Sequence, residues 1–197
     1  MRKILTVSML FFSTIFLCGA KNLPEVSVHY TIDAEKNAAK HNNMGLMYLK
    51  EYYYFGAIKE FELAIELNPN SQASSVYYNN LGRTYITIGY PELAESKFEQ
   101  AIKKYPLYFE YYKNLVEAYG KQNILEKKLQ YHKKNRKNAL DDITIALIYG
   151  AMGKTQIEVT MLDEFCNSEP DLIITPAIRK YVKEQAKMVT YSRKRLR

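Results

Sequence analysis

Two similar octets constrain the fold of this 197-residue chain more than any other feature of its sequence. "NNMGLMYL" begins at Asn42, and "NNLGRTYI" begins at Asn79, 37 residues later. Repetition with a period of roughly 20–50 residues indicates a supersecondary unit that is stacked several times, because one such unit cannot bury its apolar face alone. The chain is therefore expected to fold as an array of similar units.

The agreement between the two windows extends well beyond the octets. Aligned on Gly45 and Gly82, the windows agree in residue type at eight positions. The pairs are His41 and Tyr78, Met44 and Leu81, Gly45 and Gly82, Tyr48 and Tyr85, Ala57 and Ala94, Phe61 and Phe98, Ala64 and Ala101, and Pro69 and Pro106. Apolar residues three and four positions apart lie on one face of a helix. The spacing thus predicts two helices per unit, with small residues where the helices approach each other.

This pattern resembles the tetratricopeptide repeat family, with full units at about residues 38–71 and 75–108. Two degenerate units follow at 109–138 and 139–172. The resemblance implies an all-α fold, in which residues 34–171 form a right-handed α-solenoid of stacked helical hairpins. Alternation of apolar and polar residues over a length that would suggest a sheet is absent from the sequence.

The third unit departs from the pattern in its second helix. Lys128, His132 and Asn135 stand where the pattern has alanine, phenylalanine and alanine. The step from Tyr119 to Tyr149 is only 30 residues, so this unit is expected to lack about one helical turn.

The fourth unit keeps the spacing but has Glu158 and Phe165 at the two alanine positions. Thr175 and Pro176 then form a helix-start signal. Residues 173–197 are therefore expected to be a basic capping helix and tail, since the end of an array needs a face that tolerates solvent.

Residues 1–20 have the layout of a secretory signal peptide. Two basic residues precede an apolar stretch, and small residues end the segment at Ala20. Cleavage there leaves residues 21–33 as an extended lead-in, while a retained anchor and lipidation of Cys18 are the alternatives. The sequence predicts an exported protein of the periplasm or cell envelope.

The first helix of each unit is expected to line a concave groove. Two positions before the glycine position stand Asn43, Asn80 and Asn114, and one position after it stand Arg83 and Glu117. An amide donates and accepts hydrogen bonds, so a row of amides can pair with the backbone of an extended peptide. The resemblance implies the same use, although asparagine is also simply common at this position in the family.

One subgroup of the family binds terminal carboxylates with lysine and arginine side chains. The matching positions here include Asn42, Glu110 and Asn114. A glutamate at such a position repels a carboxylate. The sequence therefore predicts against that activity.

Positive charge is concentrated in the second half of the chain. Residues 21–110 carry nine basic and eleven acidic side chains, whereas residues 111–197 carry seventeen and ten, a net charge of +7. The excess includes a predicted basic patch of Lys127, Lys128, Lys133, Lys134, Arg136 and Lys137. Such a patch favours contact with an acidic protein or an anionic membrane surface, although a solvated helix face has the same composition.

No nucleophile motif, phosphate loop or metal-ligand spacing occurs in the sequence. We therefore expect no enzyme, no cofactor and no metal, and neither nucleic acid nor a small-molecule substrate as partner. The sequence favours an exported adaptor that binds a protein or peptide segment in its groove and supports assembly of an envelope complex. The alternative is a membrane-surface assembly factor that uses its basic C-terminal half.

Overall fold

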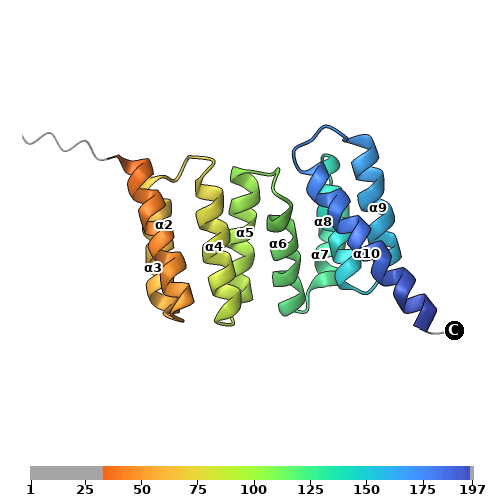
Figure 1. Ribbon diagram of the computed structural model, residues 1–197, viewed down its shortest axis with the longest axis horizontal. Helices are drawn as coiled ribbons and strands as arrows, with labels where there is room; N and C mark the ends of the chain where they lie inside the picture. The colour runs from red at the N-terminus through yellow and green to blue at the C-terminus, as the bar shows by residue number, and fades with distance from the viewer. Residues whose placement is uncertain (1–32, 196–197) are drawn as a thin grey trace, which may run out of the picture. The chain divides into compact units, whose positions relative to one another are not determined.

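The computed structural model describes residues 33–195, which contain nine helices and no strand (Figure 1). In chain order they are α2 (Ala34–Lys50), α3 (Tyr54–Leu67), α4 (Ser74–Thr87), α5 (Pro91–Lys104), α6 (Phe109–Lys121), α7 (Leu125–Lys134), α8 (Ala139–Ala151), α9 (Thr155–Ser168) and α10 (Thr175–Arg195). The predicted signal peptide, with Cys18, lies outside the described residues. None of the helices in the described part is both long enough and apolar enough to cross a membrane.

The helices pair into hairpins that stack in chain order, so the all-α solenoid predicted from the sequence is confirmed. Helices α2 and α3, α4 and α5, and α8 and α9 pack together extensively within each hairpin. Contacts of α3 with α4, α5 with α6, α7 with α8 and α9 with α10 then join the hairpins and the final helix (Figure 1).

The first two hairpins close on a glycine–phenylalanine contact. A Cβ atom added at Gly45 would lie 2.6 Å from a ring carbon of Phe61, and one added at Gly82 would lie 2.6 Å from the same carbon of Phe98. Both rings are fully buried. The four alanines of the repeat pattern are fully buried as well: Ala57, Ala64, Ala94 and Ala101. The repeated positions are therefore those where two helices touch.

Local signals explain where the helices begin. The Asp33 carboxylate accepts a hydrogen bond from the backbone N–H of Lys36 at 2.9 Å and caps α2. Pro91 occupies the first turn of α5, where its missing N–H costs nothing. Gly89 has a φ of 86° in the turn before it, a conformation that glycine adopts without strain.

The third hairpin packs differently from the others. Helix α7 has 10 residues, whereas α3, α5 and α9 have 14 each. It packs more against α8 than against α6. Lys128, at the alanine position, forms an ion pair with Glu95 of α5, and its Nζ lies 4.9 Å from the ring centroid of Tyr119. A long cationic side chain here bridges α5 and α6 where an alanine would let α7 approach.

Candidate functional site

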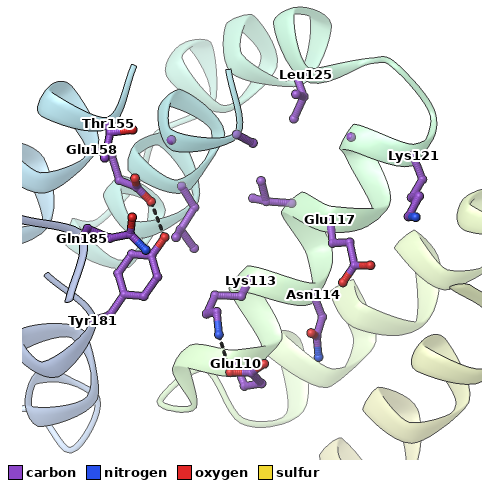
Figure 2. A pocket seen from close by; sticks show the side chains of 15 residues that line it. Glu110, Lys113, Asn114, Glu117, Lys121, Leu125, Thr155, Glu158, Tyr181 and Gln185 are labelled. Atoms are coloured by element: carbon purple, nitrogen blue, oxygen red, sulfur yellow. Dashed lines mark hydrogen bonds and ion pairs between the residues drawn. The ribbon is translucent and has the colours of Figure 1, made fainter. Parts of the chain in front are cut away.

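Two adjoining cavities open along the first helices of the second, third and fourth hairpins. The α4 cavity, of about 650 Å³, lies between α4 and the start of α6 and includes Arg83, Tyr108 and Tyr111 in its lining. The α8 cavity, of about 620 Å³, is lined from α6, the start of α7, α8, α9 and α10 (Figure 2). Glu110 lines both. The two cavities are therefore neighbours on one face of the array.

Four of the five predicted groove residues line these cavities. Asn80 and Arg83 line the α4 cavity, and Asn114 and Glu117 line the α8 cavity. Arg83 and Glu117 are exposed. Asn43 is exposed on α2 and lines neither cavity. Asn43 therefore stands apart from the two cavities that the other four residues line.

The asparagines form pairs between hairpins. The side-chain amide of Asn80 donates to Oδ1 of Asn42 at 2.8 Å, and that of Asn114 donates to Oδ1 of Asn79 at 2.7 Å. All four side chains are buried. The expected row of three equivalent amides is therefore corrected to two buried pairs, with Asn43 outside them.

The doubled asparagine in each octet explains this pairing. The second asparagine of a unit donates to the first asparagine of the unit before it. Asn43 has no preceding hairpin within the described residues, so it stays exposed. In the third unit Lys113 replaces the first asparagine, and the pairs end at Asn114. The buried partners Asn42 and Asn79 are the first residues of the two octets, but their pairing is apparent only from the packing of neighbouring hairpins.

A buried carboxylate stands at the far side of the α8 cavity. Glu158 of α9 is 2% exposed, and its Oε1 accepts a hydrogen bond from the Tyr181 hydroxyl of α10 at 2.7 Å (Figure 2). Burial raises the pKa of Glu158, and the hydrogen bond from Tyr181 opposes that shift. Burial also raises the pKa of Tyr181, so the phenol stays a hydrogen-bond donor at neutral pH.

The rest of the cavity carries charges of both signs. Lys113 donates to the Glu110 carboxylate at 3.0 Å, one turn apart on α6 (Figure 2). The Nζ of Lys113 also lies 5.9 Å from the ring centroid of Tyr181. Glu117 and Lys121 complete the charged lining. In the described part of the chain, no group of three or more His, Cys, Asp or Glu side chains converges as a metal site requires.

Half of the predicted basic patch is engaged in contacts within the chain. Lys128 is paired with Glu95, and Arg136 forms an ion pair with Asp142 at 2.6 Å. The Nζ of Lys133 donates to the Tyr149 hydroxyl.

The other three cations are exposed, and the structure shows no side-chain ion pair for them over residues 33–187: Lys127, Lys134 and Lys137. Three cations of the segment therefore make contacts within the protein, and the other three present positive charge to solvent.

A family model of the tetratricopeptide repeat matches residues 76–106, which cover most of α4 and α5. The second hairpin thus carries that repeat's sequence pattern. Comparison with curated proteins finds no match.

Several solved structures are similar at low identity. The MamA protein is 17% identical, with 77% of this chain and 91% of that chain covered and a TM-score of 0.47. YrrB, described as a TPR protein with an unusual peptide-binding site, is 17% identical over 73% of this chain and 74% of its own, with a TM-score of 0.43. The second TPR domain of human RPAP3, in complex with the HSP70 peptide SGPTIEEVD, is 15% identical over 76% and 98%, with a TM-score of 0.40. Likenesses this distant assign no function to the chain.

Proposed function

We propose that this protein is a scaffold that binds an extended segment of another protein along the α4 and α8 cavities. The observation that carries the proposal is their adjacency, since Glu110 lines both and each cavity has polar and apolar lining residues. Exposed Arg83 stands in one cavity and exposed Glu117 in the other. A partner with both apolar and charged side chains fits such a surface better than a uniformly charged one.

The surface is also held in place before a partner arrives. The buried Asn79–Asn114 hydrogen bond joins α4 to α6, the helix that lines both cavities, and the Asn42–Asn80 bond joins α4 to α2. A rigid site loses less conformational entropy on binding, so more of the contact energy appears as affinity. Half-exposed Tyr108 offers apolar area at the edge of the α4 cavity, with few rotamers to immobilise.

Site-directed photo-crosslinking in the producing cell tests this proposal. A photoreactive phenylalanine derivative replaces Arg83 or Glu117 in the cavities, or Ser96, which is exposed on α5 and lines neither cavity, as a control. We expect discrete crosslinked products from the two cavity positions and none from position 96. Equal crosslinking at all three positions, or products at position 96 alone, contradicts binding along the cavities.

For the setting, we propose an exported protein that supports assembly of a complex in the periplasm or cell envelope. The layout of residues 1–20 supports export. Mass spectrometry of the native N-terminus distinguishes cleavage after Ala20, lipidation of Cys18 and retention of the segment. An unprocessed N-terminus on protein recovered from the cytoplasm contradicts export.

A second candidate is a membrane-surface assembly factor, favoured by the three exposed lysines that have no ion-pair partner among the described side chains. Vesicles of phosphatidylglycerol and of phosphatidylcholine test it by sedimentation. Electrostatic binding requires sedimentation with the anionic vesicles alone and release by salt. Replacement of Lys127, Lys134 and Lys137 by glutamine is expected to abolish it. Equal sedimentation of this variant contradicts the membrane role of the patch.

A further inference from the structure

The burial of Glu158 has no counterpart in the regular hairpins. The corresponding position holds Ala57 in the first unit and Ala94 in the second, and both are fully buried apolar contacts. A carboxylate in such a position loses its hydration, which is costly unless hydrogen bonds or an opposite charge replace the lost water. Glu158 therefore needs a compensating group.

Only part of that compensation is present in the described part of the protein. Oε1 of Glu158 accepts the Tyr181 hydrogen bond, and Oε2 makes none with the described residues. Every fully buried side-chain nitrogen or oxygen in the described residues has a hydrogen-bond partner, so the unbonded Oε2 is open to the cavity that Glu158 lines. The carboxylate thus offers one free oxygen to whatever enters the α8 cavity.

Helix α8 has a glycine, Gly150, at the point where it meets this carboxyl group. A Cβ atom added at Gly150 would lie 2.2 Å from Cδ of Glu158 and 2.3 Å from its Oε2. The glycine removes the one side chain that would displace the carboxyl group. Three helices therefore build this site. Helix α9 carries Glu158, α8 carries Gly150, which leaves space for the carboxyl group, and α10 carries Tyr181, which donates a hydrogen bond to it.

The other walls of the cavity suit a long side chain with a cationic head. Apolar wall is supplied by Val116, Leu125 and Leu147. The charged lining consists of Glu110, Glu117, Glu158, Lys113 and Lys121, which leaves an excess of one negative charge in the more basic half of the chain. Lys113 is already paired with Glu110, so the rim lysine closest to Tyr181 has its own counter-ion.

We propose that the α8 cavity accepts a lysine or arginine side chain of the bound protein segment, with the cationic head on Glu158 and the methylene stem against the apolar wall. The inference rests on the proposed function, because it assigns one anchor residue to the segment that the cavities bind. A hydrogen bond between ionised groups in a poorly solvated site is about twice as strong as a neutral one. Glu158 then supplies selectivity at this point of the groove.

Three small probes test the assignment on the protein as isolated from its cells. They are the N-acetyl methylamides of lysine, arginine and norleucine, which share a backbone and differ in the charged head. Titration is followed by the NMR signals of the Tyr181 ring and of the Glu158 carboxyl carbon. We expect the lysine and arginine probes to bind at least about tenfold more tightly than norleucine, as one charge-assisted hydrogen bond implies.

Two variants identify the group responsible. Glu158→Gln keeps an oxygen for the Tyr181 hydroxyl and removes the charge, and we expect it to bind all three probes equally. Glu164→Gln removes an exposed carboxylate of α9 that lines neither cavity, and it is expected to change the discrimination by less than about threefold. Thermal unfolding checks that both variants fold.

Several outcomes overturn the inference: no shift of either signal with any probe, equal binding of the three probes to the unaltered protein, or discrimination that survives in Glu158→Gln. Its failure is distinguishable from failure of the proposed function. Crosslinking from position 83 does not involve Glu158, so products at that position without lysine discrimination refute the anchor alone.

Discussion

The side-chain amide of Asn80 donates to Oδ1 of Asn42 at 2.8 Å, across the boundary between the first and second hairpins. Asn114 and Asn79 repeat the arrangement at the next boundary, at 2.7 Å. Each bond joins the first helices of neighbouring units and is buried. The asparagine pairs therefore fix α4 against α2 and against α6, the helix that lines both cavities.

Replacing Asn42 by alanine is expected to lower the free energy of unfolding by about 1–3 kcal/mol, because the Asn80 amide is left buried without its acceptor. Asn43→Ala, at the adjacent exposed position, is the matched control and is expected to change it by less than about 0.5 kcal/mol. Urea unfolding measures both. Comparable losses in the two variants contradict a special role for the pair.

The double variant Asn42→Ala, Asn80→Ala sharpens this test. If the two side chains act as a pair, the double variant loses less stability than the sum of the losses in the two single variants. Each single variant leaves one buried amide without its partner, whereas the double variant leaves none. Strict additivity shows that the two residues act independently.

Gly82→Ala is expected to destabilise the second hairpin by about 1–3 kcal/mol, because the added methyl group overlaps the buried ring of Phe98. Gly120→Ala is the control. Nothing lies within 4 Å of a Cβ at that helical position, so the change is expected to raise stability by about 0.5–1 kcal/mol. Thermal unfolding measures the two changes in stability, which are expected to have opposite signs. An equal loss of stability in Gly120→Ala and Gly82→Ala rules out the steric explanation.

Lys128→Met leaves Glu95 largely buried without its cation, and we expect a loss of about 1–3 kcal/mol. Lys127→Met removes a neighbouring exposed charge and is expected to cost less than about 0.5 kcal/mol. Adding Glu95→Gln to Lys128→Met is expected to restore part of the loss. Denaturant unfolding of the three variants decides whether Lys128 belongs to the core or to a free basic patch.

Glu158 gives the folding stability a specific pH dependence. Burial raises its pKa in the folded protein, so the folded state holds the proton more strongly than the unfolded chain does. The stabilisation is complete below the unfolded value of about 4.3 and is lost as the pH rises through the raised folded value. Glu158→Gln is therefore expected to be more stable than the unaltered protein at pH 7, with the advantage shrinking toward pH 4. An advantage of the same size at both pH values contradicts this assignment.

The spacing of residues along the chain predicts most of the fold. Gly45 with Phe61 and Gly82 with Phe98 recur at one separation because each pair is the contact between the two helices of a hairpin, and both contacts are present. The shortened α7 follows from the missing turn in the third unit. Such features depend on neighbours within about 20 residues, and helical periodicity places those neighbours reliably.

The candidate site was only partly predictable. Arg83 and Glu117 were placed on the groove by their offset from the glycine position, and both line a cavity. The same offset also predicted Asn43 to lie on the groove. The offset gives the position of a residue within its unit, but it does not show whether another unit packs beside that unit. The free oxygen of Glu158 had no signal of this kind, because it depends on Gly150 and Tyr181 from two other helices.

The amino-acid sequence by itself determined the helices, their pairing into hairpins and the order in which the hairpins stack, because these follow from local periodicity and from small residues at fixed separations. Only the tertiary structure decided that Asn80 pairs with Asn42, that Lys128 reaches Glu95, and that Glu158 is buried beside Tyr181. Each of these contacts depends on the rotation and distance between a helix of one hairpin and a helix outside that hairpin. That geometry is set by the packing of the whole array, and no local pattern records it.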